Sequence, residues 1–242
     1  MSHAPHTPRA ALIVSHGQPS DPDPAEAALA ALARRVAAEL PGWQVGSATL
    51  AKTGALDAAC EAARPTPLVY PLFMTQGWFT GENLRQRLSG TYGIRVLPPL
   101  GVEAGLPGLA VDLLHDVLAA QGWKPQETAL FIAGHGSGRS PNSARDTQSF
   151  AAALTGRTGM REVRLGYVEQ APFLADVARG LGAKAICLPF FAAKGGHVID
   201  DIPQALDTAG FQGVRLGPIG CAPRVPALIA ASLRAAAGKA FW

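Results

Sequence analysis

Two histidines and one glutamate in the second half of the chain have the side chains needed to bind a divalent metal ion. His135 lies in Ile-Ala-Gly-His-Gly-Ser, Glu169 in Tyr-Val-Glu-Gln-Ala-Pro, and His197 in Gly-Gly-His-Val-Ile-Asp-Asp. Imidazole nitrogens suit cobalt, nickel, iron or zinc, and a carboxylate adds negative charge. Histidine, with a reference pKa of about 6.5, also accepts protons near neutral pH. We therefore expect these residues to combine metal binding with proton transfer.

Each histidine motif has a counterpart in the first half. His16 and Trp78 are 62 positions apart, and so are His135 and His197. Flanking segments match as well: 11–17 aligns with 130–136, and 70–73 with 188–191. The spacing indicates an internal duplication in which one copy has two histidines and the other has a histidine and a tryptophan.

The first copy also lacks the carboxylate, since Leu50 falls where the second copy has Glu169. We expect a half with a degenerate site at 1–122 and a half with the metal site at 123–242. The junction falls in the glycine- and proline-bearing stretch 121–126.

Apolar runs of strand length alternate with amphipathic segments throughout both halves. This pattern predicts an α/β protein with two similar doubly wound parallel sheets facing a cleft, because parallel neighbours must be joined by crossovers. The predicted elements of the first half are 10–14, 24–39, 44–50, 53–63, 67–73, 82–88, 94–98 and 106–120. Those of the second half are 128–133, 143–154, 162–167, 171–181, 185–189, 202–209, 214–217 and 225–237.

His135, Glu169 and His197 each follow the predicted strand that precedes them. In a parallel sheet the carboxyl ends of the strands share one edge, and ligands of open α/β folds bind there. The three side chains are therefore expected to converge.

Composition excludes several classes of protein. Of 242 residues, 48% are hydrophobic and 7% aromatic, which favours helix-covered sheets over an all-β sandwich. A formal charge of +3 is too small to indicate a nucleic-acid partner. The three cysteines form no Cys-x-x-Cys pair, which favours a reducing, cytoplasmic setting. No apolar stretch is long enough for a membrane span, so no membrane partner is expected.

The motifs resemble those of class II chelatases of the CbiX/SirB type. The resemblance covers both halves and is most specific in the strand–His-Gly-Ser motif at 130–137, the stretch 167–174, Leu-Pro-Phe-Phe at 188–191, Gly-His at 196–197 and Asp-Ile-Pro at 201–203. It implies that His135, Glu169 and His197 bind a metal ion and assist its insertion into sirohydrochlorin, a tetrapyrrole. The implied metal substrate is Co2+, with Fe2+ or Ni2+ as alternatives.

The resemblance also implies a reaction without ATP, and the chain has no Gly-x-x-x-x-Gly-Lys-Ser/Thr loop. Because the two fused copies could replace a symmetric dimer, we expect a monomer.

Four further residues are candidates for substrate binding. Arg139 and Lys194 lie close in sequence to the histidine loops and could bind the carboxylates of the tetrapyrrole, although both could be ordinary surface charges. Ser137 could contact substrate or cap the following helix. Trp78 could stack on the macrocycle or simply pack. Asp200 and Asp201 could orient His197 or cap the helix that follows.

Two hydrolytic classes fail at the motif. A histidine phosphatase needs an arginine before its His-Gly, and a serine hydrolase needs Gly-x-Ser-x-Gly; neither pattern surrounds His135 or Ser137. A non-catalytic metal or tetrapyrrole carrier of the same fold remains the alternative, because binding and insertion can use the same ligands.

Overall fold

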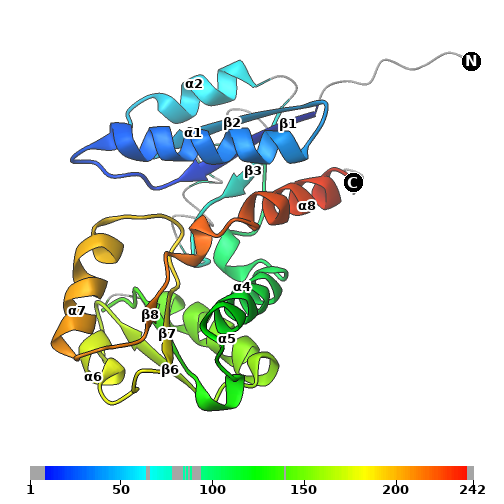
Figure 1. Ribbon diagram of the computed structural model, residues 1–242. Helices are drawn as coiled ribbons and strands as arrows, with labels where there is room; N and C mark the ends of the chain where they lie inside the picture. The colour runs from blue at the N-terminus through cyan, green and yellow to red at the C-terminus, as the bar shows by residue number, and fades with distance from the viewer. Residues whose placement is uncertain are drawn as a thin grey trace, which may run out of the picture. The chain divides into compact units, whose positions relative to one another are not determined.

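A computed structural model describes residues 9–63, 66–77, 84, 86, 88, 94–138 and 140–238. The chain forms two compact units, each an α/β layer structure (Figure 1). The first unit contains residues up to 73, then 78–99 and 224–242, and the second contains 74–77 and 100–223.

The first unit is built on a parallel sheet of strand order β2-β1-β3-β4. Its strands are β1 (Arg9–Ser15), β2 (Trp43–Thr49), β3 (Leu68–Pro71) and β4 (Arg95–Val96). Its helices are α1 (Pro22–Glu39), α2 (Ala55–Ala62) and α8 (Val225–Ala237). Leu12 and Val14 of β1 pack with Leu56 and Cys60 of α2. Because alternate strand residues face opposite sides, the buried Ile13 faces the layer that contains α1 and α8.

The second unit repeats this topology with a parallel sheet of order β6-β5-β7-β8. Its strands are β5 (Ala129–Gly134), β6 (Glu162–Tyr167), β7 (Ala185–Pro189) and β8 (Val214–Arg215). Its helices are α4 (Leu106–Gln121), α5 (Asn142–Thr158), α6 (Leu174–Ala178) and α7 (Ile202–Thr208). Phe131 packs with α6 and α7 on one face, while α4 and α5 pack together in the other layer. The two parallel α/β sheets confirm the predicted fold class.

The units exchange their final helices. Helix α4, which ends the first repeat, belongs to the second unit, and α8, which ends the second repeat, belongs to the first. The repeat junction predicted between residues 122 and 123 therefore describes the duplication of the sequence, whereas the compact units are cut differently. Local patterns could not reveal this exchange, because the apolar face of a helix does not specify the sheet on which it packs.

Several elements are shorter than predicted. The helix expected over 171–181 contains only Leu174–Ala178, because Pro172 precedes it and Gly180 and Gly182, with φ of 71° and 80°, follow it. The edge strands expected over 94–98 and 214–217 reduce to two residues each. The short helix expected over 82–88 lies mostly outside the described residues.

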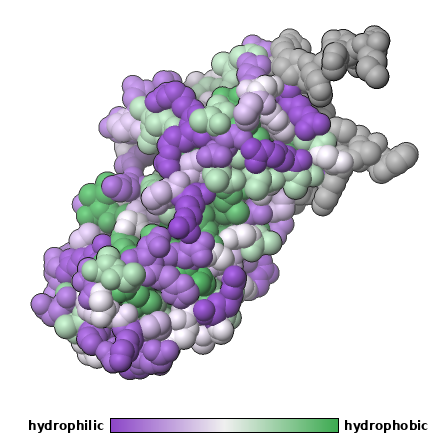
Figure 2. Space-filling model, turned by 45° about the vertical axis from the view of Figure 1, so that its right-hand side comes forward, coloured by the Kyte–Doolittle hydropathy of each residue, from purple (hydrophilic) through white to green (hydrophobic). Residues whose placement is uncertain are grey.

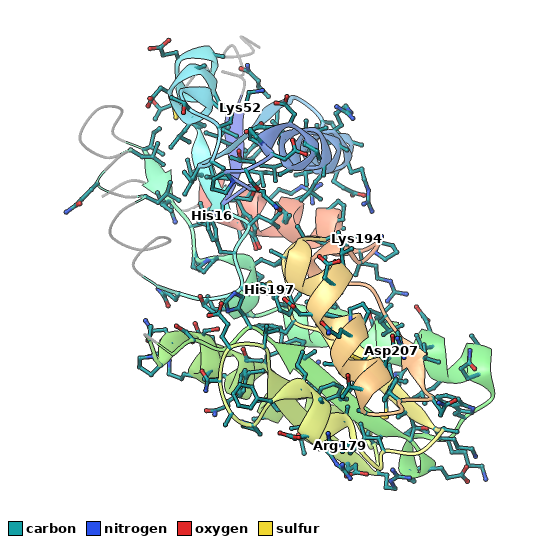
Figure 3. All side chains as sticks on the ribbon, turned by 90° about the vertical axis from the view of Figure 1, so that its left-hand side faces the viewer. His16, Lys52, Arg179, Lys194, His197 and Asp207 are labelled. Atoms are coloured by element: carbon teal, nitrogen blue, oxygen red, sulfur yellow. The ribbon has the colours of Figure 1, made fainter. Side chains whose placement is uncertain are left out.

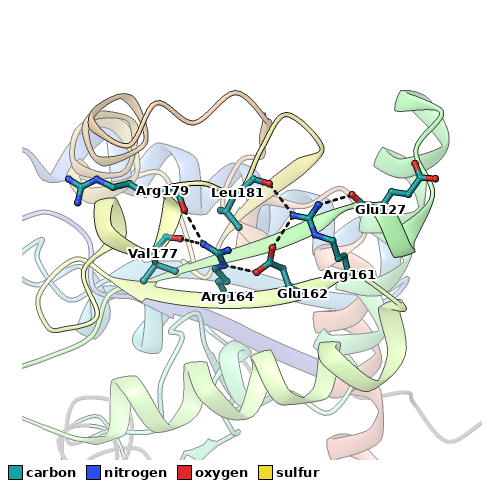
Figure 4. A network of polar contacts seen from close by, with 7 residues as sticks. All are labelled: Glu127, Arg161, Glu162, Arg164, Val177, Arg179 and Leu181. Carbon is teal, nitrogen blue, oxygen red and sulfur yellow. Dashed lines mark hydrogen bonds and ion pairs between the residues drawn. The ribbon is translucent and has the colours of Figure 1, made fainter.

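An ionic network ties together the amino ends of the second sheet (Figure 4). Arg164 donates to a Glu162 carboxylate oxygen (2.7 Å) and to the carbonyl oxygens of Val177 and Arg179, while Arg161 donates to the other Glu162 oxygen (2.9 Å). The hydrogen bond from Arg164 holds the pKa of Glu162 below its ordinary value, and Arg161 adds to this effect. This edge therefore has a structural role, and it lies at the end of the sheet opposite to the histidines.

The face shown in Figure 2 is predominantly hydrophilic, with hydrophobic patches between the polar side chains. Within the described ranges, the exposed large hydrophobic residues are Val102, Phe173 and Ile199. None of the described helices combines the length and apolar character that a membrane crossing needs.

Candidate metal centre

Three side chains, each beyond the carboxyl end of a different strand, meet at one edge of the second sheet. One potential ligand atom from each of His135, Glu169 and His197 lies within 4.8 Å of the other two. In the part of the chain that the structure describes, no other group of three or more His, Cys, Asp or Glu residues is arranged in this way. Between 38% and 47% of each side chain is exposed, so an ion can enter the site from solvent.

The backbone places Glu169 beside His135. Beyond the last paired residues of β5 and β6, the Val168 N–H donates to the Gly134 carbonyl oxygen (3.1 Å) and the Glu169 N–H to the His135 carbonyl oxygen (2.9 Å). The segments that follow β5 and β6 thus continue the pairing of the two strands beyond their ends. As a result, Glu169 Oε2 lies 3.7 Å from His135 Nδ1.

Gly136 allows the loop after His135 to turn tightly. Its φ is +71°, and a Cβ there would lie 2.6 Å from Gln170 Cγ and 2.9 Å from Tyr167 Cβ. Gln170 fixes the loop further, since its Oε1 accepts a hydrogen bond from the Ser137 N–H (2.8 Å). Sequence reasoning assigned no role to Gln170; its position directly after Glu169 was the available signal.

His197 begins a π-helical turn, η4 (His197–Asp201), that leads into α7. The Ile202 N–H donates to the His197 carbonyl oxygen across this wider turn. Pro203 supplies a reason for it, because proline has no N–H to donate to the carbonyl of Ile199, and its ring would clash with that carbonyl in a regular helix. The turn brings Asp201 Oδ2 to 2.6 Å from His197 Nδ1.

The hydrogen bonds of both imidazoles define which nitrogen is available. The Gly136 carbonyl oxygen, which can only accept, lies 2.8 Å from His135 Nδ1, and the Asp201 carboxylate occupies the same position on His197. Each neutral ring therefore has its proton on Nδ1 and a lone pair on Nε2. The ring centroids are 4.6 Å apart at an interplanar angle of 89°. The ring centroid of Phe191 lies 6.1 Å from that of His135 and 6.4 Å from that of His197, so an apolar side chain borders both imidazoles. In the sequence, Phe191 stood out only as part of a motif.

Thiolate ligands are not available within the core of this unit. Cys187 lies in β7, and burial raises its pKa to about 12, so its sulfur stays protonated near neutral pH. The groups that could bind a metal ion at this position are therefore the two imidazoles and one carboxylate that converge there.

Of the four residues predicted to bind substrate, the structure describes two. Lys194 is exposed on the loop that precedes His197, and Figure 3 shows both at one end of the second unit with Arg179 at the other. Ser137 Oγ accepts a hydrogen bond from the Ser140 N–H (3.2 Å), so this hydroxyl organises the turn before α5. Two predicted substrate-binding residues lie outside the described residues, namely Arg139 and Trp78.

The described part of the first unit contains the corresponding backbone, but no comparable cluster of His, Cys, Asp or Glu side chains. His16 Nδ1 lies 3.1 Å from the Gly17 carbonyl oxygen, and the Ala51 N–H donates to the His16 carbonyl oxygen (2.9 Å) as the Glu169 N–H does to that of His135. The position equivalent to Glu169 is therefore Ala51, and the alignment with Leu50 was wrong by one residue. The error arose because neither Leu50 nor Ala51 resembles Glu169, so residue type alone could not choose between the two alignments.

Comparison with known proteins places these motifs in one family. A family model named CbiX matches residues 129–236, which include the three site residues. A solved structure described as CbiX, the terminal enzyme for biosynthesis of siroheme in denitrifying bacteria, is 47% identical, with a TM-score of 0.86 over 94% of this chain and 99% of that one.

Two more distant structures share the fold. SirB from Bacillus subtilis with Fe3+ is 18% identical, with a TM-score of 0.72 over 95% of this chain and 96% of that one. A sirohydrochlorin chelatase SirB from Bacillus subtilis subspecies spizizenii in complex with cobalt is 17% identical, with a TM-score of 0.68 over 93% and 94%. No curated protein sequence matches the chain.

Proposed function

We propose that this chain, which belongs to the CbiX family of class II tetrapyrrole chelatases, inserts a divalent metal ion into sirohydrochlorin without ATP. The observation that carries the proposal is the convergence of His135, Glu169 and His197 at one edge of the second sheet. The identity of 47% over nearly the whole of a siroheme-forming relative supports the reaction class.

The first step is capture of the metal substrate. The lone pairs on Nε2 of His135 and His197 and the carboxylate of Glu169 replace part of the water shell of the ion. Two neutral imidazoles and one carboxylate leave the complex with a net charge of +1. A site of this kind holds the ion in place but allows its transfer to the four nitrogens of the macrocycle.

The second step is exchange of the metal for protons. Insertion of a divalent ion releases two pyrrolic protons, while the same transfer frees the three protein ligands. His135, His197 and Glu169 then become the bases nearest to the released protons, and two of them accept one proton each before solvent removes it. Metal transfer and proton acceptance thus use the same side chains in sequence.

The macrocycle needs its own contacts. Sirohydrochlorin carries several carboxylates, and we assign Arg139 and Lys194 to them because guanidinium and ammonium groups bind carboxylates by charge-assisted hydrogen bonds. We assign Ser137 to a polar contact with the macrocycle and Trp78 to stacking on the tetrapyrrole ring.

The metal substrate that we favour is Fe2+. The sequence resemblance alone suggested Co2+, but siroheme, which the 47% identical relative is described as forming, is an iron tetrapyrrole. Affinity alone cannot decide, because Co2+ binds more tightly than Fe2+ to almost any site of this kind. Selection must therefore be measured in the insertion step.

The test is insertion of the metal ion into sirohydrochlorin under anaerobic conditions and without ATP. The reaction is monitored by the change in the absorption spectrum of the macrocycle. Fe2+ and Co2+ are compared at equal free concentrations, each against its spontaneous rate. We expect acceleration with both ions and a higher kcat/KM with Fe2+. A higher kcat/KM with Co2+ would restore the cobaltochelatase assignment. Tight metal binding without acceleration would instead identify a carrier.

A further inference from the structure

We propose that Asp201 is a positioning residue that holds the His197 ring in the tautomer and orientation needed to bind the metal ion. This inference rests on the proposed function, because it concerns how the same site holds its metal substrate. It assigns a role to a carboxylate outside the set of three ligands.

The contact is short and specific. Asp201 Oδ2 lies 2.6 Å from His197 Nδ1, and the two residues are four apart on the π-helical turn. A carboxylate that accepts the Nδ1 proton leaves the lone pair on Nε2, on the opposite side of the ring. It also makes the imidazole a stronger electron donor to a bound cation.

The alternative role for Asp201, capping of α7, is not supported by its conformation. Asp201 directly precedes α7, but its φ and ψ of −68° and −43° are helical and its side chain makes no capping hydrogen bond. Residues that cap a helix by their side chains have non-helical backbone angles. Within the described structure, the side chain is therefore directed to His197 rather than to the helix.

The two histidines differ in how they are held. The Nδ1 atom of His135 faces the carbonyl oxygen of Gly136, a backbone group that no substitution removes, whereas the partner of His197 is a side chain. Orientation of His197 therefore depends on one replaceable group. The adjacent Asp200 is exposed and has the same charge, so it provides a matched control.

The experiment compares Co2+ binding by the full-length wild-type protein with that of Asp201→Ala, Asp201→Asn and Asp200→Ala, using the visible absorption of bound Co2+. Removal of a carboxylate that orients a metal-bound histidine weakens binding about 10–100-fold. We expect a loss of that size for D201A and an altered Co2+ spectrum. D201N should bind more tightly than D201A, because its amide oxygen still accepts the Nδ1 proton. D200A should match the wild type.

Two results would overturn the proposal. One is Co2+ binding by D201A that equals that of the wild type, and the other is an equal loss in D201A and D200A, which would indicate a general effect of charge. If D201A does not fold, D201N against D200A decides by Co2+ affinity: a neutral amide is a weaker acceptor than a carboxylate, so D201N should bind Co2+ less tightly than D200A, and equal binding would overturn the assignment. Because no tetrapyrrole is present, failure of insertion in a separate assay would refute the proposed function and leave this result standing.

Discussion

The two repeats share the backbone around a histidine, but among the described residues only the second has a cluster of side chains that could hold a metal ion. In each, a histidine follows the central strand, a glycine with positive φ follows the histidine (Gly17 at 75°, Gly136 at 71°), and the histidine carbonyl accepts a hydrogen bond from the neighbouring loop. The residue that donates it is Ala51 in one repeat and Glu169 in the other. The histidine and the tight turn therefore belong to the shared fold, and the chemistry is added by the side chains around them.

The largest expected effect separates the histidines. His135→Ala or His197→Ala should reduce the rate of metal insertion at least about 100-fold, because each removes a metal ligand and a proton acceptor. His16→Ala should retain most of the activity, because Ala51 stands where the second repeat has its carboxylate. Initial rates of insertion measure all three variants. A greater loss of activity in H16A than in H135A would place the site in the first repeat and contradict this assignment.

Glu169→Ala gives the second repeat the residue that the first repeat has at the equivalent position, Ala51. Loss of the only carboxylate in the set of three should weaken Co2+ binding at least about tenfold, since even outer partners of metal ligands cost that much. The reverse change, Ala51→Glu, should leave Co2+ binding unaltered, because a carboxylate added beside His16 does not supply a second histidine. Calorimetric titration with Co2+ compares the two. Unchanged binding by E169A would remove Glu169 from the ligand set.

The paired glycines separate fold from function. A Cβ at either position would lie 2.6 Å from a neighbouring side-chain carbon, of Thr49 near Gly17 and of Gln170 near Gly136. Alanine also costs about 1–2 kcal/mol in the left-handed region. We expect Gly17→Ala and Gly136→Ala to lower the free energy of unfolding by similar amounts in urea, and only G136A to impair insertion. Equal activity of the two folded variants would show that this turn does not shape the site.

The smallest effect concerns the amino edges of the two sheets. The Arg164 hydrogen bond lowers the pKa of Glu162, so its stabilisation is fully present above the ordinary value of 4.5 and is lost as pH falls through the lower folded pKa. Because the pair is about one-third exposed, Glu162→Gln should cost less than about 1 kcal/mol at neutral pH. The difference should vanish in strong acid. Urea unfolding at several pH values checks this, and a difference that persists in acid would contradict it.

The corresponding edge of the first sheet gives the contrast. The Arg9 guanidinium lies 5.7 Å from the centroid of the Trp43 ring, a cation–π contact with no titrating carboxylate. Trp43→Leu should therefore change stability by an amount that does not depend on pH in the same acid range.

The sequence predicted the two parallel sheets and the convergence of three side chains at one sheet edge, because hydrophobic alternation and residue type are local signals. It did not predict the role of Gln170, and it left two roles open for Asp201, since the positions of these side chains depend on the tight turn at Gly136 and the π-helical turn at His197. The exchange of α4 and α8 was missed for a related reason: the choice of sheet on which a helix packs is not encoded in the helix alone.

The most direct test of the central claim is a crystal of the protein soaked with Co2+ and measured at the cobalt absorption edge. We predict an anomalous peak within about 2.0–2.2 Å of the imidazole nitrogens of His135 and His197 and of a Glu169 oxygen, distances typical of first-row ions at such ligands. An anomalous peak at His16, with none at these three residues, would contradict the account.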